Sequence, residues 1–218
     1  PRAMAVLDPL KLKLTNWDAL FGAGHAEPCT APVHPHHPDM GERQFKLTSE
    51  IWIEREDFQE VPEKGFRRLF PENMARLKYG YVIKCTGCEK DAEGKVTAVL
   101  AEIVPDTKSG TPGSDSVKVK GVITWVSASE GLPVEIRLYD RLFTEAQPDA
   151  GGRNFLEALN PTSKTVIQTW VEPSLANAAA GTSYQFERHG YFVADRKDSA
   201  PGKPVFNRTT TLKDSWAK

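Results

Sequence analysis

A chain of 218 residues is long enough to bury one or two hydrophobic cores, and its composition is ordinary for a globular protein. With 28 basic and 29 acidic residues the net charge is −1, so only a local cluster of cations, and not the overall field, could hold a polyanion. The sequence has no apolar run near the roughly 18 residues of a membrane span, no secretory signal and an odd number of cysteines, which favours a cytoplasmic protein.

The sequence begins at Pro1 rather than at a methionine, and this favours a piece of a longer protein. Most of the chain alternates apolar and polar residues with the period of two that is typical of β-strands. The stretches expected as strands are residues 45–53, 81–89, 95–104, 117–127, 133–143, 163–171, 183–195 and 204–212. Gly94 can supply a positive φ between the second and third of these, so they are expected to pair as a hairpin. Short helical segments are expected at residues 55–58, 153–159 and 174–180, the last ending at Gly181.

Two long stretches lack a strand pattern. Residues 105–116 are rich in Gly, Ser, Pro and Asp, and residues 25–43 contain four prolines that are expected to bar a regular strand or helix. Many short strands between turns predict an all-β fold, and the length suits two small β-barrels with a few short helices. Because the loop at 105–116 divides the strands, we expect a first barrel region at residues 1–116 and a second at residues 117–218.

The stretch from Phe66 to Lys84 concentrates five basic residues among aromatic rings, with Glu72 as its single acid. Lys and Arg bind phosphates, and flat rings stack on unpaired bases, so the pattern is typical of a surface for single-stranded RNA. The alternative is a solvated basic hairpin whose rings belong to the core, and this stretch by itself does not exclude it.

The segment SYQFERHGYF, residues 183–192, is the second candidate for RNA contact. The amide of Gln185 can contact the edge of a base, and the guanidinium of Arg188 can bind a base or a phosphate. Strict alternation would place them on opposite faces of a strand, so they can meet one ligand only if the strand twists or bulges near Gly190. The alternative is that Glu187 and Arg188 pair with neighbouring side chains while Gln185 faces water.

Other groups of residues do not predict catalysis or metal binding. Cys85 and Cys88 have the spacing of a zinc or redox pair, but the sequence holds no second CxxC and the pair falls within a predicted strand. The histidines of residues 34–37 lack a regular ligand spacing. No GxSxG, GxxxxGK[ST] or GxGxxG motif occurs, so we expect no catalytic residue, metal or cofactor in this chain.

Eight segments span the chain in order: PRAMAVLDP, HPDMGER, EIWIEREDF, YVIKCTGCEKDAEG, KVKGVITWVSA, LPVEIRLYDRLF, YQFERHGYF and KPVFNRTTTLKDSWAK. Together they resemble the C-terminal half of bacterial glutaminyl-tRNA synthetase, a class I aminoacyl-tRNA synthetase, from Pro1 to Lys218. The catalytic HIGH and KMSKS-like signatures, which lie upstream in that family, do not occur in this sequence.

The resemblance implies two barrels, proximal and distal to a catalytic core, in a fold shared with a ribosomal protein that binds 5S RNA. The distal barrel would lie mainly at residues 40–116, and residues 1–39 would contribute to the proximal barrel, with strands crossing between the two. The partners would be the anticodon loop and stem of glutamine tRNA and the catalytic half of the same polypeptide. We expect a monomer with no DNA or membrane partner. The parent enzyme would use ATP and Mg, and this chain would hold neither.

The resemblance also implies which residues meet the three splayed anticodon bases. The central uridine would meet Arg2, Gln185 and Arg188. The third base, a guanine, would meet Arg67 and Arg68. The first base would meet Arg76 and Lys78.

This sequence departs from the family pattern at three positions. Lys78 stands where the family has Arg, so a planar fork becomes a point charge. Arg67 stands where the family has Lys, which adds a planar donor. Gly65 stands where the family has a glutamine that contacts the uridine, so the uridine pocket is expected to rely more on Arg2 and Gln185.

Three alternatives remain at this point. Glutamyl-tRNA synthetases of the eukaryotic or archaeal type share these barrels, although YQFERHGYF and KPVFNRT favour glutamine. Outside RNA binding, the chain could be a β-domain for a small molecule or carbohydrate, or a free-standing enzyme that uses Cys85 and Cys88.

Overall fold

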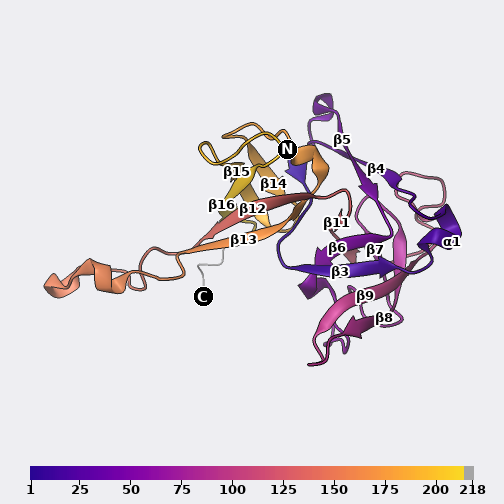
Figure 1. The fold of residues 1–218 in the computed structure, drawn as a ribbon, viewed down its shortest axis with the longest axis horizontal. Coiled ribbons are helices and arrows are strands. Elements are labelled where there is room, and N and C mark those ends of the chain that lie inside the picture. Colours follow the sequence, from indigo (N-terminus) through magenta and orange to yellow (C-terminus); the bar gives the residue numbers. More distant parts are fainter. Residues whose placement is uncertain (214–218) are drawn as a thin grey trace.

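Two seven-stranded, barrel-like sheets form the framework of the computed structural model, which describes residues 1–213 (Figure 1). In spatial order, the first sheet consists of β10 (Val122–Ile123), β7 (Met74–Leu77), β8 (Val82–Lys90), β9 (Val96–Ile103), β3 (Pro9–Leu14), β6 (Glu50–Glu54) and β11 (Trp125–Ser127). The second consists of β1 (Arg2–Ala3), β14 (Ser183–Phe186), β15 (Gly190–Ala194), β16 (Val205–Thr211), β12 (Leu132–Tyr139), β13 (Lys164–Val171) and β2 (Ala5–Val6). The predicted all-β fold with two barrels is confirmed.

The first barrel buries one face of each strand, as the alternating pattern of β3 illustrates: Leu10, Leu12 and Leu14 are buried and the residues between them are not. A separate hairpin, β4 (Glu27–Pro32) with β5 (Glu42–Leu47), covers this barrel and packs Phe45 and Leu47 into the same core. Helix α1 (Trp17–Phe21) closes the end of the barrel with a buried tryptophan, and no sequence pattern indicated it because five residues are too few to show a helical period.

The second barrel has a smaller core centred on three phenylalanines. Phe186 and Phe192 stack with ring centroids 4.3 Å apart, and Phe206 lies edge-on to Phe186 at 5.1 Å. The two edges of its sheet come from neighbouring segments of the chain, because β1 pairs in parallel with β14 while β2 pairs with β13. The first six residues therefore close this barrel, and the chain begins between the two barrels (Figure 1).

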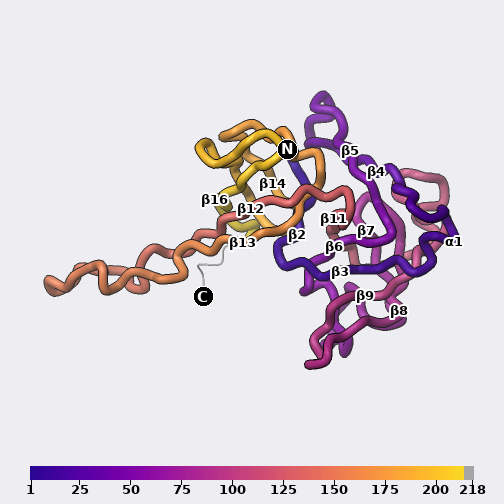
Figure 2. The backbone as a smooth tube through the Cα atoms, in the orientation of Figure 1, coloured from indigo at the N-terminus to yellow at the C-terminus, as the bar shows by residue number. Residues whose placement is uncertain are grey.

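The remaining helical segments are single 3₁₀ turns: η1 (Pro38–Met40), η2 (Arg55–Asp57), η3 (Ala150–Gly152), η4 (Phe155–Ala158) and η5 (Pro173–Leu175). Two of them, η2 and η4, lie within helical segments expected from the sequence, and η5 overlaps the start of the third. Residues 140–163 form a long arm between β12 and β13 that projects away from both barrels (Figures 1 and 2). No helix within residues 1–213 is long and apolar enough to cross a membrane.

Four expected strands are shorter or broken in the structure. Residues 45–53 form two strands in different sheets, because the Thr48 hydroxyl bonds to Ser127 and to the backbone of Glu50 where the chain turns. Residues 183–195 also form two strands, because Arg188 adopts a left-handed backbone with φ of 73°. Only 122–123 and 125–127 of residues 117–127 are strand, and β12 ends at Tyr139 rather than at residue 143.

The expectation that prolines bar a regular strand or helix over most of residues 25–43 was wrong for residues 27–32, which form β4. Pro28 and Pro32 occupy alternate positions of this strand, and its buried residues are Cys29 and Ala31 between them. Beyond the strand, the Val33 N–H donates to the Gly41 carbonyl. The backbone N–H groups of the odd-numbered residues of β4 therefore point toward β5. The prolines thus sit where the missing N–H would point away from the partner strand.

The sheets exchange strands across the expected domain boundaries. Strands β10 and β11, which follow residue 116, join the first sheet. Among residues 1–39, β1 and β2 join the second sheet and β3 joins the first. Residues 214–218, the end of the KPVFNRTTTLKDSWAK segment, lie outside the described residues.

Candidate nucleic-acid interface

The turn after β14 inserts three consecutive ionisable side chains, those of residues 187–189, between the two barrels. Strand alternation ends at the buried Phe186, and the left-handed backbone of Arg188 turns the chain back into β15. Each of these three side chains contacts different residues of the first barrel or of its covering hairpin. Glu187, Arg188 and His189, together with the side chains that they contact, are called here the junction.

Glu187 lies in the centre of the junction and is almost fully buried. It accepts hydrogen bonds from Arg43 Nη2 at 2.5 Å and from the Tyr79 hydroxyl at 3.0 Å, and it pairs with the ammonium of Lys78. The carboxylate therefore binds β5 and the end of β7 to the second barrel. Lys78, expected to meet the first anticodon base, is held here by a protein carboxylate.

Arg43 joins Glu187 to a second buried carboxylate, Glu172. Arg43 Nε lies 2.7 Å from Glu172 Oε1, an ion pair without the alignment of a hydrogen bond, and its Nη1 donates to the Pro32 carbonyl. Burial lowers the pKa of Arg43, but the charges of the two carboxylates outweigh it and the net pKa is raised. Burial also raises the pKa of Glu172. Arg43 and Lys78 together balance the two acids, so the cluster is neutral in sum.

Asp57 is the partner of Arg188 in the junction, and its carboxylate is completely buried. The guanidinium of Arg188 donates to both carboxylate oxygens, with both N–O distances 2.7 Å. Arg68 Nε lies 3.1 Å from Oδ1, while its Nη2 donates to the Glu56 carbonyl at 3.0 Å. The hydrogen bonds to Asp57 raise the pKa of Arg188. One carboxylate thus holds a guanidinium from each barrel.

His189 completes the turn by pairing with Glu54. The imidazole Nε2 lies 2.9 Å from Glu54 Oε1, and the same carboxylate accepts the backbone N–H groups of Leu7 and Asp8 at 2.5 and 3.0 Å. Burial opposes ionisation of Glu54, but these hydrogen bonds and the charge of His189 hold its pKa below the ordinary value. Glu54 therefore fixes the segment that crosses from β2 in one barrel to β3 in the other.

Arg2 and Gln185 lie side by side at the edge of the second barrel. They are partners in the parallel pairing of β1 with β14, so their side chains share one face of the sheet. The Gln185 amide donates to the Tyr191 hydroxyl at 3.3 Å, and Arg2 has no side-chain partner within residues 1–213. The expected alternative that Glu187 and Arg188 pair with neighbouring side chains is confirmed, and Gln185 is half exposed.

Arg76 is bound to the loop at residues 105–116. Its Nη1 donates to the carbonyl of Thr107 at 2.6 Å and its Nη2 to the carbonyl of Ser114 at 2.5 Å. A further bond to the Gly80 carbonyl, at 3.2 Å, ties the loop to the end of β7. Like Lys78, Arg76 is thus engaged by protein acceptors.

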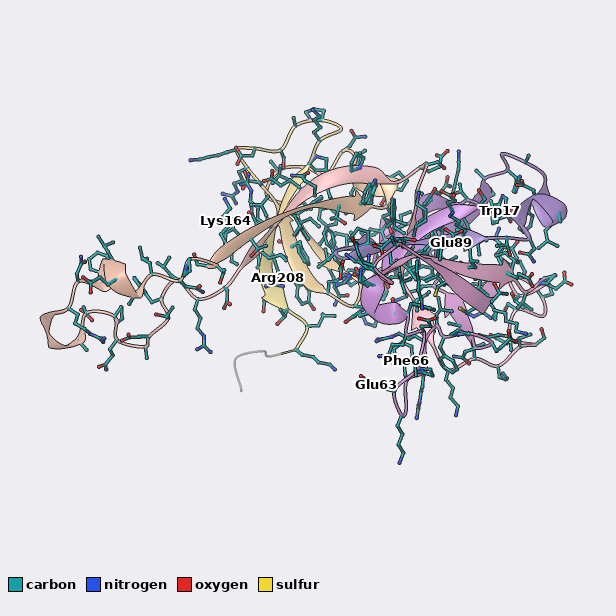
Figure 3. All side chains as sticks on the ribbon, turned by 60° about the horizontal axis from the view of Figure 1, so that its bottom comes forward. Trp17, Glu63, Phe66, Glu89, Lys164 and Arg208 are labelled. Atoms are coloured by element: carbon teal, nitrogen blue, oxygen red, sulfur yellow. The ribbon has the colours of Figure 1, made fainter. Side chains whose placement is uncertain are left out.

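Arg67 differs from the other cations of its stretch because its side chain is exposed and has no partner among the described residues. It borders a pocket of about 390 Å³ lined by Phe66, Arg67, Phe70, Asn73, Met74, Lys118, Val119 and Lys120. The loop that carries Phe66 projects from the first barrel (Figure 3). The rings of Phe66 and Phe70 lie 6.4 Å apart, so the pocket combines aromatic surface with three cations that have no partner within residues 1–213.

Sequence reasoning missed several residues of this surface. Lys118 and Lys120 could have been suspected from the pattern KVK, but their distance in sequence from Arg67 hid the pocket. Asp57, Glu172 and the buried role of Arg43 gave no signal, because an acid or base in a polar segment is usually solvated.

The cysteines do not gather into a site. Cys85 is buried in the first core and Cys88 is half exposed beyond a bulge at Gly87, and burial raises the pKa of both thiols. No group of three or more His, Cys, Asp or Glu side chains that could hold a metal ion occurs in residues 1–213.

The chain is similar to known proteins along its full length. Two family models described as "tRNA synthetases class I (E and Q), anti-codon binding domain" match residues 1–104 and 122–195. The glutamine–tRNA ligase of Ralstonia pickettii is 65% identical over 218 residues, which are all of this chain and 37% of that protein. Those of Cupriavidus taiwanensis and Bordetella pertussis are 63% and 57% identical over 217 and 216 residues, 36% of each relative. The chain thus spans little more than a third of the length of these relatives, and it belongs to the family of anticodon-binding domains of class I tRNA synthetases (E and Q).

Proposed function

We propose that this chain is the anticodon-binding part of a glutamine–tRNA ligase, and that it reads the CUG or UUG anticodon of glutamine tRNA across the junction. The observation that supports this most directly is the pairing of Arg2 with Gln185 on neighbouring strands. A second pair, the guanidinium groups of Arg68 and Arg188, meets at Asp57. Residues from the two ends of the chain thus form one pair, and residues from its middle and its last part form the other.

The chemistry of the bases fits these groups. The edge of uracil offers an N–H between two carbonyl oxygens, which suits the amide of Gln185 as donor and acceptor with the guanidinium of Arg2 as a further donor. Guanine offers O6 and N7, which accept two parallel hydrogen bonds from one guanidinium. Arg67 is exposed and unpaired within the described chain, and Arg68 keeps donors beyond those that contact Asp57 and Glu56.

The first anticodon base would contribute least to recognition. To reach Arg76 or Lys78, it must compete with the Ser114 carbonyl and the Glu187 carboxylate that already bind them. Weak selection at this position agrees with a protein that accepts both CUG and UUG, because those anticodons differ only in the first base.

In this proposal the chain supplies recognition and the catalytic half of the same polypeptide supplies chemistry. That half would use ATP and Mg²⁺ to activate glutamine as an aminoacyl-adenylate and would pass it to the terminal adenosine of the tRNA. The chain would work in the cytoplasm as part of a monomer, without a DNA or membrane partner. Its identity with glutamine–tRNA ligases along the full 218 residues favours glutamine over glutamate.

Binding of glutamine tRNA should fall by about tenfold or more when its third anticodon base is changed from G to C, which creates a glutamate anticodon. Gln185→Ala should weaken binding of the cognate tRNA by a similar factor, because the contact to the uridine is lost. It should leave the affinity for a uridine-swapped tRNA nearly unchanged. Lys84→Ala is the control, because Lys84 is exposed and paired only with the exposed Glu72 at 2.7 Å; it should weaken all tRNAs alike. Titrations at two salt concentrations measure these affinities.

Equal affinity for all anticodons, with only a salt slope, would leave a generic polyanion binder. Absence of RNA binding would favour the reading as a small-molecule or carbohydrate domain. Preference for the glutamate anticodon would transfer the proposal to the glutamyl enzyme.

A methyl group at Gly121 should disturb reading of the third base more than reading of the second. A Cβ on Gly121 would lie 2.3 Å from the Arg67 carbonyl oxygen and 3.1 Å from the Arg68 Cα, so the backbone of the two arginines must shift. We expect Gly121→Ala to cost about 1–3 kcal/mol in stability and to reduce discrimination between G and C several-fold. Gly80→Ala is the control, because its Cβ would meet its nearest neighbour at an ordinary 3.4 Å. Equal discrimination in both variants, measured by competition binding, would show that the Gly121 contact does not position these arginines.

A further inference from the structure

We infer that Asp57 is a positioning residue shared by the readout of two neighbouring anticodon bases, an inference that rests on the proposed function. Asp57 itself is 0% exposed and cannot touch RNA. The two side chains that it holds are partly exposed, Arg68 at 34% and Arg188 at 26%. The proposed function assigns Arg68 to the third base and Arg188 to the pocket of the second, so one buried carboxylate supports both.

The carboxylate sets the plane of the Arg188 guanidinium and holds that of Arg68 by its charge. Arg188 uses one donor on each Nη for Asp57, with two equal bonds of 2.7 Å that lock the plane of the group. Arg68 forms an ion pair with Asp57 at 3.1 Å that lacks the alignment of a hydrogen bond, and its orientation is set by the hydrogen bond to the Glu56 carbonyl and by the Phe66 ring 5.1 Å from its Cζ. A guanidinium has five donors, so each keeps donors for RNA in a plane that the protein has already set.

Sharing one carboxylate makes the two arginines energetically dependent on each other. A buried carboxylate that loses one cation binds the remaining cation more closely, because the low-dielectric surroundings make an unpaired charge costly. Removing either arginine therefore changes the position of the other. Since Arg68 belongs to the first barrel and Arg188 to the second, the coupling also crosses the junction.

Asp57→Asn tests this inference, because it keeps the size of the side chain but offers one acceptor oxygen instead of two. The probes are glutamine tRNA and its variants swapped at the second or the third anticodon base. We expect the ratio of the affinities for cognate and swapped tRNA to fall about tenfold at both positions in this variant. The affinity for a doubly swapped tRNA should change little. Loss of discrimination at one position alone, or at neither, would overturn the inference.

Glu54→Gln is the matched control, because Glu54 is a carboxylate of the same junction, almost fully buried, that holds His189 and not an arginine. It should reduce thermal stability as Asp57→Asn does, yet retain discrimination at both positions. If the two variants lose discrimination equally, general loosening of the junction explains the effect and the shared role of Asp57 is wrong.

A double-mutant cycle tests the same coupling in protein that retains Asp57, so it applies even if Asp57→Asn fails to fold. Arg68→Ala, Arg188→Ala and the double variant should each lose affinity for the cognate tRNA by a measurable factor. The product of the two single factors should differ by at least about threefold from the factor of the double variant. Purely multiplicative losses would refute the inference while leaving the proposed function intact. A wild-type protein that does not discriminate among the tRNAs would instead refute the proposed function.

Discussion

Replacing Arg43 by methionine is expected to lower the free energy of unfolding by about 3–5 kcal/mol. Methionine fills a similar volume, so the loss would come from charge and not from a cavity. Within residues 1–213, Arg43 is the only cation that pairs with the buried Glu172, and it also binds Glu187 and the Pro32 carbonyl. Its removal leaves Glu172 buried without a counter-charge. Denaturation by urea, followed by circular dichroism, measures the change.

Two comparisons separate this explanation from a general sensitivity to losing arginines. Arg153→Met should change stability by less than about 1 kcal/mol, because Arg153 and its partner Glu145 are 51% and 46% exposed. Adding Glu172→Gln to Arg43→Met should recover part of the loss, because a neutral amide can still accept the N–H of Met4 that the carboxylate now binds at 2.7 Å. If Arg43→Met were as mild as Arg153→Met, the buried cluster would not stabilise the junction.

Phe186→Ala should cost about 3–5 kcal/mol and should act mainly on the second barrel. The ring is completely buried, stacks on Phe192 and contacts Phe206, so its loss removes the centre of that core. Because the first barrel has its own cluster of buried side chains, amide hydrogens of β8 and β9 should keep their protection. Hydrogen exchange should show lost protection in β14, β15 and β16.

Phe155→Ala is the control for this prediction, because Phe155 lies in the projecting arm and is 49% exposed. Its effect on stability should be small, and protection in both barrels should be retained. Equal loss of protection in the two barrels of Phe186→Ala would instead mean that the barrels unfold as one unit.

The sequence pattern predicted the β-class and the approximate position of most strands because burial on one face of a sheet imposes a period of two. It failed where a single residue redirects the backbone. Arg188 adopts a positive φ that bulky side chains seldom take, and Thr48 turns the chain with a hydroxyl contact to a residue far away in sequence. Pro28 and Pro32 misled the prediction because the rule against proline in strands depends on which way each N–H would point.

The candidate site was predictable as a set of residues but not as an arrangement. Resemblance to a family named the cations and Gln185, since such residues can be matched by position. It could not indicate that Arg76 is bound to a loop, that Lys78 is bound to Glu187, or that Arg68 and Arg188 share one carboxylate. Those pairings depend on contacts between residues far apart in sequence, which a period or a motif does not encode.

The position of residues 2–6 at both edges of the second sheet has a consequence for how the protein folds. These residues are synthesised well before their partner strands β13 and β14, which end at Val171 and Phe186. At translation rates of about 5–20 residues per second, they wait roughly 10–40 s for those partners. The first barrel has all its strands once Ser127 is made. It can therefore form earlier, and the high contact order of the second makes closure by β1 and β2 a late, slow step.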